Sequence, residues 1–252
     1  MGRPECRSLL GPRRCSRFTG PPLAVLYFRR TLNPAGPDPD MLEINEEIPF
    51  LWRLSSDREE GFSLVSMVIP FHSGSQNLEH TIHTDIVSYT GDNEQLEDEE
   101  VLEWNEDDIA LFLKLLSTRQ QPVEGAATQT FRVDLSDPGT IEIVNIVAAA
   151  GFGMALTVDD LLVTDPGDAQ AALTEPEIGT RITLHTVDGY KRGVVVGTEE
   201  DEVVCVLLDP IRPDHHNDLS DIHPHDLVVV KPHQLLPARY SSQEPGASDV
   251  LH

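Results

Sequence analysis

Histidine and aspartate are concentrated in one short stretch near the C-terminal end of the chain. Residues 214–226 hold four histidines and four aspartates in thirteen positions. Imidazole nitrogens and carboxylate oxygens together suit zinc, nickel or manganese, and the candidate metal ligands are His215, His216, His223 and His225. A proline-flanked polar loop has a similar composition, and the spacing matches no established ligand signature. We therefore expect no bound cofactor, with Zn²⁺ or Ni²⁺ at these histidines as the alternative.

A second histidine group lies earlier, at His72, His80 and His83, with Asp85 two residues further on. On a strand, His83 and Asp85 would share a face, but the spacing is not the His-x-His-x-Asp-His pattern of metallo-β-lactamase-like hydrolases. The chain also has no G-x-S-x-G, P-loop, H-E-x-x-H or C-x-x-C motif. Cys205 stands among valines, which predicts a small buried side chain instead of a nucleophile. These observations favour a protein that is not an enzyme.

Acidic residues outnumber basic ones over most of the chain. The 252 residues include 43 Asp or Glu and 18 Lys or Arg, which gives a net charge of -25. Residues 41–176 carry 27 acids and five bases, whereas residues 177–240 carry eleven acids and six bases. This charge disfavours nucleic acid and anionic membranes as main partners, because both repel a polyanion. No stretch approaches the roughly 20 apolar residues that a membrane helix needs.

The densest acidic run lies at 92–108, where ten of seventeen residues are Asp or Glu. Such a run attracts a basic protein surface, and the attraction weakens as salt rises. The candidate partner-binding residues are Asp92, Glu94, Glu97, Asp98, Glu99, Glu100 and Glu103. We expect the partner to be a protein with a basic surface, with no direct nucleic-acid contact for this part of the chain and no membrane partner.

Residues 1–40 differ in composition from everything that follows. They carry seven arginines and three acids, a net charge of +4, and no periodic apolar pattern. We expect a disordered extension here. An organelle transit peptide is one interpretation of an Arg-rich, acid-poor leader; the alternative that the change of composition favours is that Met41 is the true first residue.

Residues 41–164 predict an acidic domain of the α+β class. Segments 48–54 and 62–71 are rich in β-branched and aromatic residues, which favours a hairpin, and a third strand is predicted at 82–89. A helix is expected over 106–117, with Asn105 as its N-cap and acids against its dipole. Its buried stripe is predicted to consist of Ile109, Phe112, Leu113 and Leu116.

A second helix is predicted to begin at Asp137-Pro138 and to stop at Gly151, and Thr157 is predicted to cap a short third helix. The residues Ala149-Ala150-Gly151-Phe152, followed by Leu156-Thr157-x-Asp159-Asp160-Leu161, resemble the helix-turn-helix half of Nif11-type leader domains. The resemblance covers about 25 residues and consists mostly of general capping signals. It does not enter the functional prediction.

A linker is predicted at 165–177, a second domain at 178–240 and a disordered tail at 241–252. The second domain begins with Arg181–His185, where apolar and polar residues alternate as in a half-buried strand. Short apolar runs follow at Gly193-Val194-Val195-Val196, Val203–Leu208, Leu227–Val230 and Leu235-Leu236-Pro237. This order resembles the SH3-like small β-barrels of Tudor and KOW-type modules. The resemblance implies an all-β barrel that binds RNA, methylated side chains or protein segments. With few aromatic residues and an acidic balance, protein contact is the expected role.

The sequence therefore predicts a cytoplasmic, two-domain protein that acts through protein contacts in a regulatory or docking role. One alternative is an acidic mimic of nucleic acid that occupies the basic surface of another protein. The other alternative is a metal-dependent enzyme that uses the histidine-rich loop at 214–226.

Overall fold

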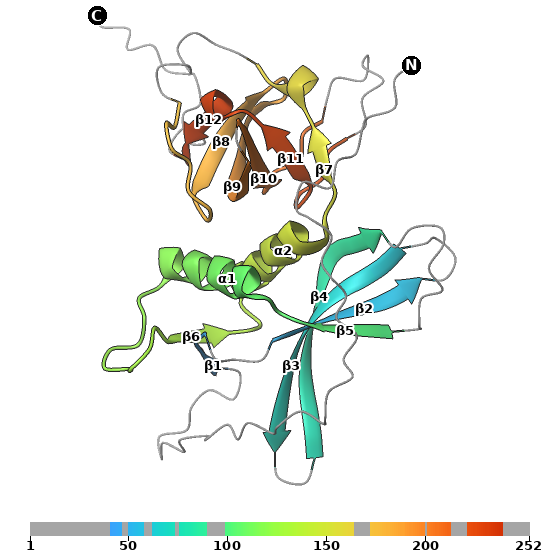
Figure 1. The fold of residues 1–252 in the computed structure, drawn as a ribbon, viewed down its shortest axis with the longest axis vertical. Helices are drawn as coiled ribbons and strands as arrows, with labels where there is room; N and C mark the ends of the chain where they lie inside the picture. Colours follow the sequence, from blue (N-terminus) through green and yellow to red (C-terminus); the bar gives the residue numbers. More distant parts are fainter. Residues whose placement is uncertain are drawn as a thin grey trace, which may run out of the picture. The chain divides into compact units, whose positions relative to one another are not determined.

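The computed structural model describes residues 41–46, 50–57, 62–73, 76–89, 99–163, 172–199, 201–212 and 221–238 (Figure 1). The predicted extension 1–40 and tail 241–252 lie outside these residues. Over the described part the chain is rich in β-strands and has two α-helices, so the α+β class holds in a loose sense. None of the helices in this part is long and apolar enough to cross a membrane.

Contacts divide the chain into two compact units, with the division between Gly153 and Met154. We call the described residues up to Gly153 the N-terminal unit and those from Met154 the C-terminal unit. This division falls ahead of the linker predicted at 165–177. Residues 155–163, which the prediction placed in the first domain, instead pair with strands of the C-terminal unit.

The N-terminal unit contains a four-stranded antiparallel sheet in the order β4-β3-β2-β5. Its strands are β2 (Leu51–Asp57), β3 (Phe62–Ser73), β4 (Gln76–Tyr89) and β5 (Glu99–Glu103). The predicted hairpin is confirmed as β2 and β3, and the predicted third strand is part of the longer β4. The strand β5 was not predicted, since it lies within the acidic run.

A second, two-stranded sheet joins β1 (Met41–Ile44) to β6 (Phe131–Asp134) in antiparallel register. Both strands are only four residues long, and neither was predicted. Their inward side chains, Ile44, Phe131 and Val133, are buried. These apolar contacts hold together two segments that lie almost 90 residues apart in sequence.

The helix α1 (Glu106–Arg119) begins where the sequence predicts. The Asn105 side chain accepts a hydrogen bond from the Asp108 amide at 2.8 Å, and the Asp108 carboxylate accepts one from the Asn105 amide at 3.1 Å. This capping box satisfies two otherwise unpaired donors. The buried stripe is Asp108, Leu111, Phe112, Leu115 and Leu116. The prediction was wrong for Ile109 and Leu113, which are half-buried at the margin of the stripe.

The helix α2 (Pro138–Phe152) has Asp137 as its N-cap and proline in its first turn, as predicted. The predicted stop at Gly151 is wrong, because the helix runs through that glycine to Phe152 and has Gly153 as its C-cap. Phe152 packs edge-on against Trp52 of β2, with ring centroids 5.6 Å apart. That contact accounts for one more helical residue after Gly151.

The C-terminal unit is built on a six-stranded sheet in the order β12-β8-β9-β10-β11-β7. Five strands match the predicted apolar runs: β8 (Arg181–Thr186), β9 (Gly189–Glu199), β10 (Glu202–Leu207), β11 (Leu227–Val230) and β12 (Leu235–Pro237). The sixth, β7 (Ala155–Thr157), pairs in parallel with β11. The strand ladder does not close into a barrel, but Leu162 forms an isolated bridge to Thr186 of β8.

The prediction of a third helix, capped by Thr157, is wrong. Thr157 ends a strand, and only a 3₁₀ turn follows at Asp159–Leu161, with no side-chain cap. Val158 and Leu161 are buried in the core of the C-terminal unit. A strand thus stands where the Nif11-type resemblance implies the turn between two helices, and the resemblance does not describe this segment.

Candidate functional site

The acidic run meets the described structure at β5, the edge strand of the four-stranded sheet. Glu99 and Glu103 are exposed and Glu100 is half-buried. The Glu99 carboxylate forms an ion pair with the Nε atom of Arg53 on β2. The other predicted partner-binding residues, Asp92, Glu94, Glu97 and Asp98, lie outside the described residues.

Exposed acids continue from β5 into the first turn of α1. Glu106 and Asp107 are exposed there, and their negative charge also favours the helix dipole. Asp108 is different: it is 4 % exposed and accepts a hydrogen bond from the Trp52 indole at 3.2 Å. The sequence groups Asp108 with the other acids, whereas the structure makes it an internal link between α1 and β2.

One face of the four-stranded sheet carries exposed apolar side chains. Leu64 on β3 pairs with Val87 on β4, and the two side chains are 54 % and 47 % exposed. Val101 on β5 is 50 % exposed and lies opposite Arg53. The alternate residues of β2, including Trp52, are buried on the opposite face. Apolar and acidic side chains therefore share one outer surface.

The histidine-rich loop lies partly outside the described residues, which exclude His215 and His216. His223 has an exposed side chain whose Nδ1 atom lies 3.8 Å from the Asp226 carboxylate, and His225 has a positive φ of 71°. Within the described residues no three His, Cys, Asp or Glu side chains gather in an arrangement that could hold a metal. The four-histidine set remains a prediction, which calorimetry with Zn²⁺ and Ni²⁺ tests.

The earlier histidine group is dispersed along the hairpin of β3 and β4. The exposed His83 has its Nδ1 atom 3.1 Å from the Ser66 hydroxyl across the two strands. A serine beside a histidine is the start of a nucleophile and base pair. Ser66 is only 5 % exposed, however, so a substrate has little access to its hydroxyl. The contact is best understood as a cross-strand hydrogen bond.

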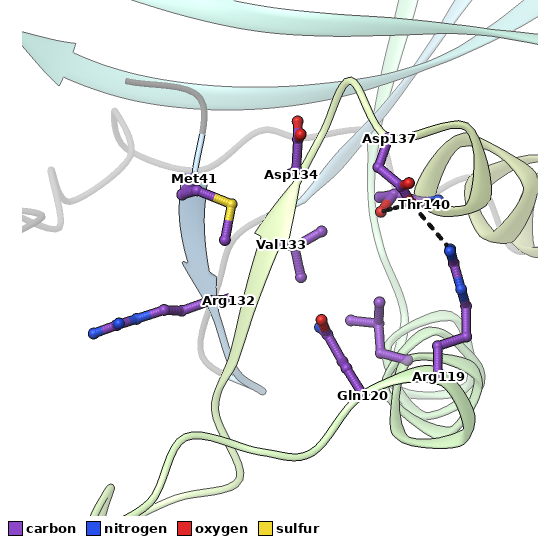
Figure 2. A pocket seen from close by; sticks show the side chains of 9 residues that line it. Met41, Arg119, Gln120, Arg132, Val133, Asp134, Asp137 and Thr140 are labelled. Atoms are coloured by element: carbon purple, nitrogen blue, oxygen red, sulfur yellow. Dashed lines mark hydrogen bonds and ion pairs between the residues drawn. The ribbon is translucent and has the colours of Figure 1, made fainter. Parts of the chain in front are cut away.

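A cavity of about 290 Å³ opens between the end of α1, the sheet of β1 and β6, and the start of α2. Figure 2 shows its lining of polar and apolar side chains, which the sequence did not single out. The lining side chains that carry charge are Arg119, Arg132, Asp134 and Asp137. The cavity is at the small end of the range for ligand pockets.

The charged side chains that line this cavity already have bonding partners within the N-terminal unit. Arg119 Nη1 lies 3.1 Å from Asp137 Oδ2, and Arg132 Nε lies 3.1 Å from Glu43 Oε1. Burial raises the pKa of Asp137, but hydrogen bonds from the Thr140 amide and from Arg119 outweigh it and lower that pKa. Arg119 and Asp137 thus join the end of α1 to the start of α2, Arg132 joins β6 to β1, and Asp134 accepts hydrogen bonds from the Ser136 amide and hydroxyl.

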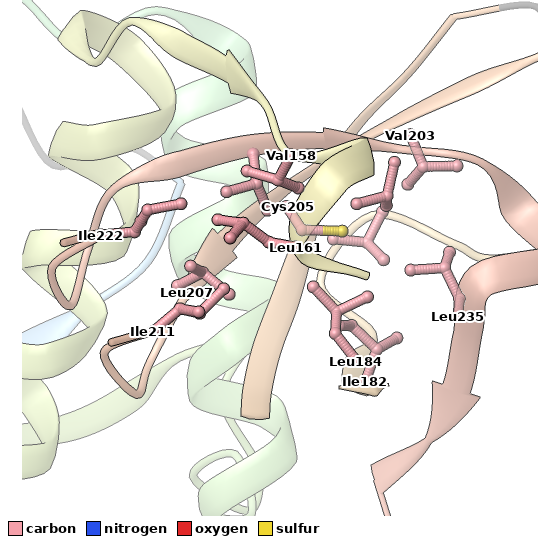
Figure 3. Packing of buried hydrophobic residues seen from close by; sticks show 13 residues of the cluster. Val158, Leu161, Ile182, Leu184, Val203, Cys205, Leu207, Ile211, Ile222 and Leu235 are labelled. Carbon is pink, nitrogen blue, oxygen red and sulfur yellow. The ribbon is translucent and has the colours of Figure 1, made fainter. Parts of the chain in front are cut away.

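Cys205 lies in the core of the C-terminal unit, as predicted. Figure 3 shows its sulfur among the side chains of Val158, Leu161 and Leu184. The side chain has no exposed surface, and burial raises the pKa of the thiol to about 12. It is a packing residue, since a thiol with such a pKa holds almost no thiolate at neutral pH.

The C-terminal unit also holds a tightly bonded surface ion pair. Arg192 on β9 donates from Nε and Nη2 to the two carboxylate oxygens of Asp209, at 2.9 and 2.6 Å. The Arg192 amide donates to the same carboxylate at 2.9 Å. These bonds hold the turn after β10 against β9. In the sequence, only the opposite charges of the two residues indicate the pair.

Comparison with known proteins assigns the chain to no family. The chain matches no protein-family model, and no curated protein or solved structure is significantly similar to it.

Proposed function

We propose that this chain is a non-enzymatic, regulatory or docking protein whose N-terminal unit binds a protein with a basic surface. The observation that carries the proposal is the continuous exposed strip of acids from β5 into α1: Glu99, Glu103, Glu106 and Asp107. Residues 41–153 hold 22 acids and five bases, a net charge of -17, so the surrounding field adds to the local attraction.

The exposed apolar side chains support a docking role over a purely solvated acidic surface. Leu64, Val87 and Val101 lie on the same face of the sheet as Glu99 and Glu103. Protein interfaces commonly combine an apolar centre with a polar rim, in which charge sets orientation and association rate.

For the C-terminal unit we propose an SH3-like small barrel that provides a second protein contact. The eleven-residue β9, the register shift between Val204 and Cys205, and the bridge from Leu162 to Thr186 support that architecture. A long strand with a bulge is the usual means by which a small sheet bends toward closure. We also propose that the chain acts in the cytoplasm, for which its reduced, buried Cys205 is a compatible feature.

Affinity capture from the native host tests the first proposal. Wild-type protein is compared with a Glu103→Gln, Glu106→Gln, Asp107→Asn variant at low and high salt, with mass spectrometry of the captured proteins. A matched variant, Glu175→Gln, Asp201→Asn, Glu202→Gln, removes three exposed acids from the C-terminal unit. The proposal is supported if basic proteins bind the wild type and the matched variant at low salt, but are captured neither at high salt nor by the first variant. Partners whose capture is unchanged by salt and by the first variant contradict it.

A nucleic-acid mimic is the narrower form of this function. If the captured protein binds nucleic acid, duplex DNA or RNA added to the captured complex should displace the chain, because both compete for one basic surface. Retention of the chain at saturating nucleic acid would show that it uses another surface of that partner.

A further inference from the structure

We propose that the free edge of β5 accepts an extended, lysine- or arginine-rich segment of a partner protein as a fifth strand of the four-stranded sheet. This inference rests on the proposed function and names how the basic partner is held. Addition of a strand to an exposed edge gives affinity through main-chain hydrogen bonds and specificity through alternate side chains.

The backbone of β5 has one side committed to β2 and one side open. The Trp104 amide donates to the Phe50 carbonyl at 3.0 Å, which marks these opposed residues as a hydrogen-bonded pair. In an antiparallel ladder such pairs alternate. The amides of Glu100 and Leu102 therefore point to β2, and those of Glu99, Val101 and Glu103 point away from it. Among the described strands, none pairs with that outer side.

The side chains of the open positions define what the added strand should carry. Glu99, Val101 and Glu103 are all exposed and alternate acid, apolar, acid along one face. In a paired strand the directly opposed side chains interact, and opposite charges are favourable there. A segment with basic side chains flanking an apolar one fits this pattern.

A second copy of this chain fits poorly at the same edge. Antiparallel pairing of two β5 strands centred on Val101 would place Glu99 of one copy opposite Glu103 of the other, at both ends of the pair. Like charges that face each other across strands are destabilising. Glutamates at a sheet edge thus prevent self-association, while they attract a basic strand.

The first test is amide hydrogen exchange of the full chain by NMR, with and without a synthetic peptide. The probe is the nine-residue peptide Lys-Thr-Val-Thr-Lys-Thr-Val-Thr-Lys, of about the length of ordinary strands, in which lysine and valine alternate along one face because they stand at every second position. We expect the peptide to slow exchange at the amides of Glu99, Val101 and Glu103 by about tenfold or more, because added main-chain bonds must open before exchange. A peptide of equal charge with proline at every valine position should have no such effect.

Variants of Val101 distinguish the contribution of its backbone amide to peptide binding from that of its side chain. Val101→Pro removes an outward amide and no bond to β2, a position where an edge strand tolerates proline. We expect Val101→Pro to weaken peptide binding by about tenfold, and Val101→Thr, which keeps the amide, to stay within about threefold of wild type. Thermal unfolding of each variant verifies that it folds, and the exchange measurement on wild type does not depend on any variant.

Charge variants test the choice of partner. Glu103→Lys should weaken binding of the lysine peptide by about tenfold at low salt, whereas Glu124→Lys, the same change at an exposed loop residue, should leave it within about twofold. Suppose that Glu103→Lys and high salt weaken peptide binding, while Val101→Pro does not and the peptide does not slow exchange at the outward amides. The strand addition is then wrong and the basic-partner function stands. If capture from the host ignores salt, the basic-partner function itself fails.

Two further outcomes would overturn the proposed occupant. If the three outward amides are already protected in the free full-length chain at low concentration, the edge is held by another part of the same chain. If their protection rises with protein concentration, a second copy occupies the edge.

Discussion

At the scale of single residues, the ion pair of Arg192 and Asp209 gives a pH-dependent prediction. Hydrogen bonds from Arg192 lower the pKa of Asp209 against the opposing effect of burial. A carboxyl whose folded pKa lies below the unfolded value of about 3.9 stabilises the protein above that value, and the contribution is lost as the pH falls through the folded pKa. Arg192→Met should therefore cost about 1 kcal/mol of unfolding free energy at neutral pH.

Urea unfolding of wild type and Arg192→Met across the acidic range checks this prediction. The difference between the two proteins should shrink toward zero once both forms have a protonated Asp209. Asp209→Asn should show the same loss at neutral pH, and because it lacks the carboxyl, its stability should have no contribution from protonation at residue 209. A difference that stays constant down to the lowest pH would mean that Arg192 acts by packing instead of charge.

Cys205 supplies a second prediction at this scale. Because the thiol is fully buried and burial raises its pKa to about 12, alkylation of the native protein should spare it. Peptide mapping by mass spectrometry after iodoacetamide treatment should find Cys205 modified only in denaturant. Rapid labelling under native conditions would contradict the packing seen around its sulfur in Figure 3.

At the scale of elements, β9 depends on a glycine at one close contact. A Cβ atom on Gly193 would lie 3.0 Å from the Val206 carbonyl oxygen of β10, and that backbone atom cannot move aside without disturbing the ladder. Gly193→Ala should destabilise the C-terminal unit by about 1–3 kcal/mol, as overpacking does in other cores. Circular dichroism during thermal or urea unfolding measures the loss.

Gly189 at the β8–β9 turn provides a contrast, because the backbone conformation favours glycine there and the available space does not require it. It has a φ of 85° and open space around its Cβ position. Asparagine tolerates the left-handed region, so Gly189→Asn should cost well under the loss from Gly193→Ala. Equal losses at the two sites would show that the close approach to Val206 is not the cause.

Capping signals and apolar runs allowed both helix starts and most strands to be predicted, but not the strands β1, β5, β6 and β7. Asn105 and Asp137 form the predicted caps because those interactions are local in sequence. The strand β5 is rich in glutamate, a poor strand former, and exists because β2 supplies a partner. Likewise β7 has three residues and depends on β11, so no local pattern could reveal it.

The candidate site was predicted in part for the same reason. The acidic run is a property of composition, so Glu99, Glu100 and Glu103 could be selected from the sequence. Which of their backbone groups point outward depends on the register with β2 and on the Trp104–Phe50 bond. The ion pair of Arg119 with Asp137 was not predicted, because it joins the end of α1 to the start of α2, 18 residues later.

At the scale of the whole molecule, net charge should make the N-terminal unit more stable as salt rises. Residues 41–153 carry 22 acids and five bases, and the excess negative charge is repulsive in the compact state, a repulsion that salt screens. Its ion pairs, such as Arg119–Asp137 and Arg132–Glu43, weaken in salt, but such half-exposed pairs contribute about 0–1 kcal/mol each. The repulsion should therefore dominate the response.

Tryptophan fluorescence isolates this response, because the only two tryptophans, Trp52 and Trp104, stack in the core of the N-terminal unit. We expect the thermal midpoint from their emission to rise by a few degrees between about 20 and 300 mM NaCl, the shift that roughly 1 kcal/mol produces in a domain of this size. Glu103→Gln with Glu124→Gln removes two exposed acids and should raise the low-salt midpoint and flatten the salt response. A midpoint that falls with salt would mean that ion pairs outweigh the excess of acids.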